Sequence, residues 1–72
     1  MDLKQVAVVK DGNTLIKDAK GKTDNGRLQV FAKAPPRLLK GDKITIEAAG
    51  DFKATGIYMD ENPRGTLNFK ID

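Results

Sequence analysis

The sequence contains no histidine, cysteine, serine or tryptophan among its 72 residues. The chain therefore lacks the nucleophiles of Ser–His and Cys–His catalysis and the commonest proton shuttle at neutral pH. It also lacks the nitrogen and sulfur ligands that zinc and most transition metals prefer, and it has no disulfide. We therefore expect a protein that is not an enzyme and that holds no metal or cofactor.

Carboxylates remain as candidates for acid–base chemistry. Most of the ten Asp and Glu residues fall in expected turns, where Asp is favoured because it hydrogen-bonds to nearby backbone groups. Glu47 stands within an expected strand, where a cross-strand ion pair is its ordinary role. No two carboxylates are arranged as a pair for general acid–base catalysis, which supports the same expectation.

Long apolar runs are missing as well. No stretch approaches the roughly 20 apolar residues of a transmembrane helix, and residues 1–10 contain no hydrophobic block of signal-peptide length. The absence of cysteine is compatible with a reducing compartment. These features predict a cytoplasmic protein that does not associate with membranes.

A chain of this length predicts a single domain, residues 1–72. The core of so small a domain supplies a net stability of roughly 3–5 kcal/mol unless a disulfide or metal reinforces it. Neither reinforcement is available here. The domain must therefore pack efficiently or gain stability from a partner or a second copy of itself.

Apolar and polar residues alternate with a period of two, and no helical period appears. Turn signals such as Asp11-Gly12 and Asn25-Gly26 separate the runs, and Pro35-Pro36 excludes a central strand from the connection 34–42. This pattern predicts an all-β fold: a small antiparallel barrel of five or six short strands, SH3-like or OB-like, with a two-sheet β-sandwich as the alternative. The expected strands are 3–10, 14–17, 27–33, 43–49, 52–59 and 66–71, with polar loops at 18–26 and 60–65.

Alternation also gives each expected strand an inward face. Phe31 then points outward from the third strand and Tyr58 from the fifth, where Gly56 indicates a bulge or a close backbone approach. The expected core consists of Leu28, Val30, Ala32, Ile44, Ile46, Ala48, Ile57, Met59, Leu67, Phe69 and Ile71, with either Val6 and Val8 or Ala7 and Val9, with Leu15 or Ile16, and with Leu38 and Leu39 over one end.

The charge of the chain is unevenly distributed. Residues 1–36 carry seven cations and four carboxylates, a net charge of +3, whereas residues 37–72 carry six of each. All of the excess positive charge therefore lies in the first half. An acidic partner such as nucleic acid would respond to it, and an ordinary solubilising surface would show the same imbalance.

An aromatic ring among cations on a strand face matches the surface that single-stranded nucleic acid needs, because the ring stacks a base and the cations follow the phosphates. OB-fold and cold-shock barrels bind in this way. Three structural explanations for Phe31 are also open. The ring could cover a minor core beneath the 18–26 loop, a bulge could reverse the register of its strand, or the ring could lie in a dimer interface. The candidate binding residues are Phe31 and Tyr58 for stacking, Arg27, Lys33, Lys22 and Lys70 for phosphates, and Gln29 between them.

Two functions are compatible with these features. The first is a protein–protein interaction or assembly module (an inhibitor, an adaptor or a small structural subunit), because a small core and exposed strand edges favour pairing with a protein partner or in self-association. The alternative is a single-stranded nucleic-acid-binding module. The spatial arrangement of the cations decides between them: convergence of Lys17, Lys20, Lys22, Arg27 and Lys33 beside Phe31 favours nucleic acid.

Overall fold

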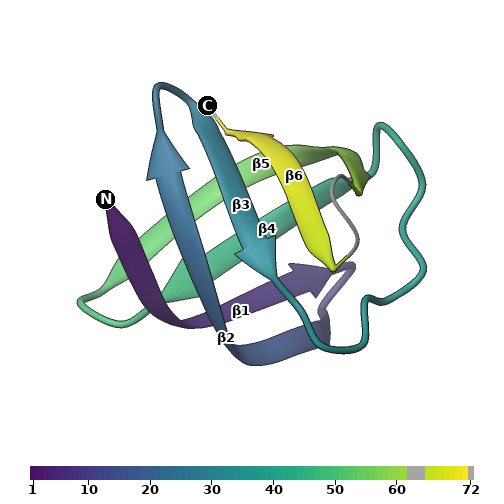
Figure 1. The fold of residues 1–72 in the computed structure, drawn as a ribbon. Coiled ribbons are helices and arrows are strands. Elements are labelled where there is room, and N and C mark those ends of the chain that lie inside the picture. Colours follow the sequence, from purple (N-terminus) through teal and green to yellow (C-terminus); the bar gives the residue numbers. More distant parts are fainter. Residues whose placement is uncertain (62–64, 72) are drawn as a thin grey trace.

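Six strands close into an antiparallel barrel in the computed structural model, which describes residues 1–61 and 65–71 (Figure 1). The order around the barrel is β1-β2-β3-β6-β5-β4, and β4 pairs with β1 to close it. The prediction of a small antiparallel barrel is confirmed, and the sandwich alternative is not adopted. The strands are β1 (Asp2–Lys10), β2 (Asn13–Asp24), β3 (Arg27–Phe31), β4 (Lys43–Ala48), β5 (Phe52–Glu61) and β6 (Thr66–Ile71).

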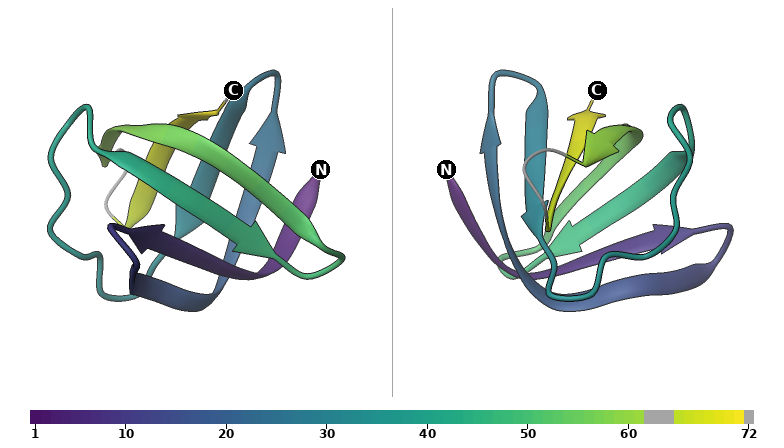
Figure 2. Two further views of the ribbon diagram at one scale, coloured as in Figure 1. Left: turned by 180° about the vertical axis from the view of Figure 1, so that it is seen from behind. Right: turned by 45° about the vertical axis from the view of Figure 1, so that its right-hand side comes forward.

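The barrel consists of two three-stranded antiparallel units, β1–β2–β3 and β4–β5–β6, which join along β3–β6 and β1–β4. The connection 32–42 links the two units and stands as an extended loop beside the barrel (Figure 2). Every one of these six strands has a neighbour on both sides. The barrel therefore offers no fully open strand edge, which removes the edge-pairing argument for a protein-interaction module.

Two Gly-containing hairpin turns, Asp11-Gly12 and Asn25-Gly26, form where the sequence predicts them. Asp11 and Gly12 have φ values of 51° and 78°, and Asn25 and Gly26 have φ values of 48° and 76°. Two successive positive φ angles are typical of the type I′ turn, which matches the twist of antiparallel strands. These turns connect β1 to β2 and β2 to β3.

The core contains most of the expected side chains. Tyr58 and Phe69 form its aromatic centre, with ring centroids 5.5 Å apart and planes inclined at 58°. Val6 and Val8, rather than Ala7 and Val9, are the inward pair of β1. The buried apolar residues are Leu3, Val6, Val8, Leu28, Val30, Ile44, Ile46, Tyr58, Leu67 and Phe69, and Ile16, Ala19, Ala32, Leu38, Ala48, Phe52 and Ile71 pack against them.

The prediction of a polar loop at 18–26 is wrong, because β2 continues to Asp24. Its inward positions there are Ala19 and Gly21, too small to produce the apolar signal of a strand. A Cβ at Gly21 would lie 2.9 Å from the Gln29 carbonyl oxygen, so only glycine fits. Phe31 therefore stands opposite Lys20 of a strand and does not cover a core beneath a loop.

The prediction of which β5 side chains point inward is also wrong. Tyr58 is buried in the core, whereas Ile57 and Met59 are 38% and 39% exposed. A Cβ at Gly56 would lie 2.8 Å from the Lys70 carbonyl oxygen, so this strand passes close to β6 as the glycine indicated. The opposite orientation would have buried Lys53, which shares the face of Ile57.

The connection between the units differs from expectation in one detail. Leu38 packs against the core, but Leu39 is 68% exposed and covers nothing. Of the polar turn expected at 60–65, the first two positions belong to β5, which continues to Glu61, and residues 62–64 lie outside the described residues. No helix in the described part of the chain is long and apolar enough to span a membrane.

Candidate nucleic-acid interface

The outer face of β2, β3 and β6 carries most of the candidate binding residues. Paired residues of adjacent strands point to the same side of a sheet, so the strand registers define which side chains are neighbours. Alternate residues of β3 on this face lie about 7 Å apart. Three cross-strand rows make up the face: Lys20–Phe31–Thr66, Lys22–Gln29–Asn68 and Asp24–Arg27–Lys70.

One end of this face is hollowed beside the ring of Phe31, which is 45% exposed. We call this hollow the Phe31 groove. Apolar side chains and three lysines line it together, so a planar apolar group and an anion would both find complementary surroundings there. The apolar lining includes Leu15, Phe31, Ala32 and Ala34, and the charged lining is Lys17, Lys20, Lys33 and Asp18.

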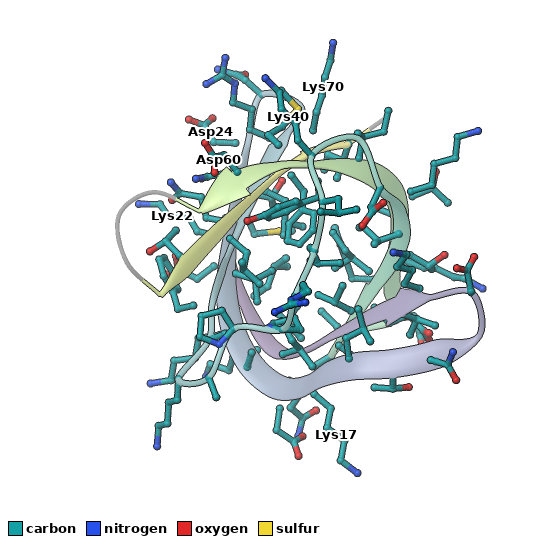
Figure 3. The ribbon with its side chains drawn as sticks, turned by 90° about the vertical axis from the view of Figure 1, so that its right-hand side faces the viewer. Lys17, Lys22, Asp24, Lys40, Asp60 and Lys70 are labelled. Atoms are coloured by element: carbon teal, nitrogen blue, oxygen red, sulfur yellow. The ribbon has the colours of Figure 1, made fainter. Side chains whose placement is uncertain are left out.

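A second hollow, the Gln29 groove, adjoins it along the same strands. Its apolar lining is Met59, Phe69 and Ile71, so the side chain that β5 contributes to this groove is Met59 and not the expected Tyr58. Figure 3 shows Lys22, Asp24 and Asp60 on one side of the barrel and Lys17 at the opposite end. The polar and charged side chains that line the groove are Lys22, Asp24, Asn25, Arg27, Gln29, Asn68 and Lys70.

The two grooves together hold the excess charge of the molecule. Their linings contain six cations and two carboxylates, a net charge of +4, compared with +3 for the whole chain. The rest of the chain is therefore close to neutral. Of the five cations whose convergence beside Phe31 would favour nucleic acid, Lys17, Lys20 and Lys33 line the groove beside the ring, whereas Lys22 and Arg27 line the Gln29 groove.

An amide pair occupies the middle of the face. The Gln29 side-chain Nε2 donates a hydrogen bond to Asn68 Oδ1 across β3 and β6, at 3.3 Å. A primary amide has two donor hydrogens and an acceptor oxygen, and this contact uses one of the donors of Gln29. The bond holds the plane of the Gln29 amide and determines which side its oxygen faces.

The structure places six of the seven predicted site residues in the linings of the two grooves. Lys22, Arg27, Gln29 and Lys70 line one groove, and Phe31 and Lys33 line the other. Tyr58 is the exception, because it is buried against Phe69 and cannot stack a ligand. Sequence reasoning also missed Met59 and Asn68 as groove residues. Only the register between β3 and β6 reveals that Asn68 lies beside Gln29.

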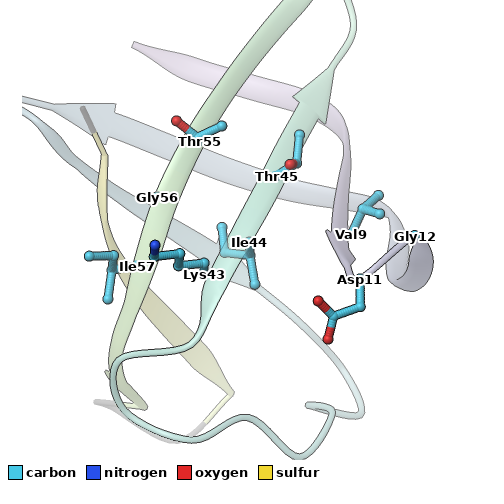
Figure 4. A pocket seen from close by; sticks show the side chains of 9 residues that line it. All are labelled: Val9, Asp11, Gly12, Lys43, Ile44, Thr45, Thr55, Gly56 and Ile57. Atoms are coloured by element: carbon cyan, nitrogen blue, oxygen red, sulfur yellow. The ribbon is translucent and has the colours of Figure 1, made fainter.

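A third hollow lies on the β1–β4–β5 side of the barrel (Figure 4). Its lining includes Val9, Thr45, Thr55 and Ile57, with Lys43 and Asp11 as its charged residues. One cation and one carboxylate give it no net charge, and no aromatic side chain lines it. This side is therefore less suited to a polyanion than the Phe31 and Gln29 grooves.

A carboxylate anchors the connection that borders the Phe31 groove. Asp42 Oδ2 accepts hydrogen bonds from the Leu39 backbone N–H at 2.8 Å and from Lys10 Nζ at 2.9 Å. The Leu39 bond lowers the pKa of the Asp42 carboxyl, and Lys10 lowers it further. The bond to Leu39 is the kind of local backbone contact that the sequence predicts for Asp residues in turns.

Folding lowers the pKa of Asp42, so its ionised form stabilises the fold when the pH is above the ordinary pKa near 3.8. This contribution to stability is lost as the pH falls through the lowered pKa of the folded state. We expect Asp42→Asn to melt below the wild type at pH 7 and the two to converge in acid. Thermal melts followed by circular dichroism across this pH range measure the difference. Asp51→Asn, an exposed turn substitution with the same charge change, is the control. A difference that persists unchanged in acid would contradict the assignment.

The described residues contain no cluster of three or more Asp and Glu side chains that would suit a metal ion. No protein-family model matches the chain, and neither a curated protein nor a solved structure shows significant similarity to it. The geometry and charge of the two grooves are therefore the observations that bear on function.

Proposed function

We propose that this protein binds single-stranded nucleic acid across the outer face of β2, β3 and β6. The observation that carries the proposal is the concentration of the excess positive charge in two adjoining grooves that flank an exposed aromatic ring. Cations beside a stacking ring provide the two contacts that every nucleotide offers, a phosphate and a base face.

The ring favours a single strand over a duplex. Phe31 is the last residue of β3, at one end of this face, and its exposed surface is available to one unpaired base. The bases of a duplex are stacked on each other and present only their edges in the grooves, so the ring would have no base face to contact. The phosphates of a duplex would still be attracted to the cations, and we therefore expect weaker but measurable duplex binding.

The cations predict a salt-dependent affinity. Each phosphate contact to a single strand contributes a slope of about −0.7 to log K against log salt, so full use of the six groove cations gives about −4. Fluorescence anisotropy of an end-labelled oligothymidylate, between about 50 and 200 mM salt, measures this slope. The label belongs on the oligonucleotide because the chain has no tryptophan.

Charge-neutralising variants test where the phosphates lie. Lys20→Gln and Lys22→Gln should each reduce the slope by about 0.7. Lys53→Gln is the matched control, because this exposed lysine of β5 faces Glu47 of β4 and lines neither groove. Absence of binding at low salt, or binding that is insensitive to salt, would rule out the proposed function.

A protein-interaction role is the second candidate, and the exposed apolar side chains of β5 support it. Ile57 and Met59 point outward, and Leu39 projects from the connection. Closure of the barrel argues against strand pairing, so such a partner would dock on side chains rather than on a strand edge. Sedimentation that shows concentration-dependent association, together with no oligonucleotide binding, would favour this function.

A further inference from the structure

We propose that the carboxylate of Asp18 binds the edge of the base that stacks on Phe31 and favours guanine. This inference rests on the proposed function, and it assigns one residue of the Phe31 groove to base recognition while the cations attract phosphates. The juxtaposition that carries it is a carboxylate and an exposed aromatic ring in the lining of one groove.

A bulge in β2 brings Asp18 to the groove. Between two of the pairs that β1 forms with β2, the single residue Ala7 lies opposite two residues, Lys17 and Asp18. An extra residue of this kind bends the strand and redirects its side chains. Asp18 has a φ of 58°, in the left-handed region that few residues other than Gly, Asn and Asp adopt. Lys17 and Asp18 both line the groove, whereas strict alternation would place neighbouring residues on opposite faces of the sheet.

The carboxylate lies near the ring and is free to bind a ligand. Phe31 pairs with Lys20, and Asp18 stands two positions before Lys20 on the same strand. Diagonal neighbours of this kind lie about 7–8 Å apart, a separation that an aromatic side chain can span. Among the described residues, Asp18 forms no ion pair and no side-chain hydrogen bond. Both of its oxygens can therefore accept hydrogen bonds from a base that stacks on the ring.

Guanine matches a carboxylate better than the other bases do. An ionised carboxylate has two acceptor oxygens and no donor, and unpaired bases are recognised along their Watson–Crick edges. The Watson–Crick edge of guanine presents a ring N–H and an exocyclic amine side by side, so each oxygen accepts one hydrogen bond. Adenine and cytosine offer one amine beside a ring nitrogen that is itself an acceptor. Thymine offers one N–H between two carbonyl oxygens, which repel a carboxylate.

The charge of Asp18 has a second effect, which opposes the first. It partly cancels the field of the three lysines that line the groove, Lys17, Lys20 and Lys33, and so weakens the attraction of phosphates. Removal of the charge alone should therefore raise the affinity for every oligonucleotide. Loss of base recognition should lower the affinity for guanine relative to the other bases, so the ratio of affinities separates the two effects.

The test uses short, end-labelled oligothymidylates whose central base is thymine, guanine, adenine, cytosine or hypoxanthine, which is guanine without its exocyclic amine. We expect the wild type to bind the guanine oligonucleotide at least about fivefold more tightly than the thymine one, which is the lower end of the discrimination given by a bidentate pair. Hypoxanthine should lose most of this preference, because it retains only one of the two donors.

Asp18→Asn should abolish the guanine preference and bind the thymine oligonucleotide at least as tightly as the wild type does. Asparagine has the same shape as aspartate and tolerates a positive φ, so the bulge should remain. Asp51→Asn is the matched control, because this exposed turn residue has a φ of 59° and lines neither groove. It should retain the preference. Melting followed by circular dichroism verifies that both variants fold.

The outcomes separate this inference from the proposed function. Salt-dependent binding of all five oligonucleotides with equal affinity overturns the guanine preference and leaves the proposed function intact. Hypoxanthine binding as tightly as guanine, or a guanine preference that persists in Asp18→Asn, also overturns the role of Asp18 without affecting the proposed function. Failure of the wild type to bind any of the oligonucleotides overturns both. The hypoxanthine comparison uses the wild type and does not depend on the folding of a variant.

Discussion

Replacing Phe31 with alanine should weaken the binding of single-stranded oligonucleotides roughly 5- to 150-fold, because stacking of a base on an aromatic side chain contributes about 1–3 kcal/mol. The fold should survive, since the ring is 45% exposed and contributes little to the core. A melting temperature within a few degrees of the wild type would demonstrate this. Anisotropy titration at fixed salt measures the affinity.

Two further substitutions at this position separate stacking from general apolar contact. Phe31→Tyr retains a ring and should retain most of the affinity. Phe31→Leu retains apolar bulk without an aromatic face, so it should bind almost as weakly as Phe31→Ala. If leucine restores full affinity, the ring does not stack a base, and if alanine binds as well as the wild type, the grooves are not the binding site.

The same change at Phe69 should have the opposite consequence. Phe69 is 1% exposed on β6 and packs against Tyr58. Truncation of a buried phenylalanine to alanine costs about 3–5 kcal/mol, because it removes apolar contacts and leaves a cavity. A domain of this size has roughly 3–5 kcal/mol of net stability, so Phe69→Ala should be largely unfolded at room temperature. Urea titration followed by circular dichroism measures the loss.

Phe31→Ala is the natural control for this experiment, because it deletes the same atoms from the neighbouring strand on the opposite face of the sheet. Phe69→Leu should retain part of the lost stability, since it refills some of the cavity. If Phe69→Ala unfolded cooperatively with the same urea midpoint as the wild type, this ring would not be part of the core.

Much of the fold follows from local patterns in the sequence. The alternation at Leu28 and Val30, at Ile44 and Ile46 and at Leu67 and Phe69 predicts the inward faces of β3, β4 and β6, and the structure confirms all three. The Asp-Gly and Asn-Gly turns are equally local, because the positive φ angles they require favour these residues.

Orientation of β5 could not be predicted from apolar alternation alone. Ile57 and Met59 on one face compete with Phe52, Ala54 and Tyr58 on the other, so apolar residues occur on both faces. The polar residues Lys53 and Thr55 indicate the orientation of β5, because they share the face of Ile57 and would be buried with it if Ile57 pointed inward. Close approach of β6 to Gly56 then allows only a glycine at that inward position.

For the candidate site, the sequence alone determined the residue types: an aromatic among cations on β3, an excess of positive charge in the first half, and no side chains for nucleophilic catalysis. Tertiary structure decided which of them meet. Lys22 and Lys70 lie 48 positions apart in the sequence but pair with successive outward residues of β3, Gln29 and Arg27. Tyr58, expected on the surface, is buried in the core. The physical reason is that a strand's own pattern reflects burial along one chain, whereas closure of the barrel and strand register depend on how strands that are distant in sequence pack together.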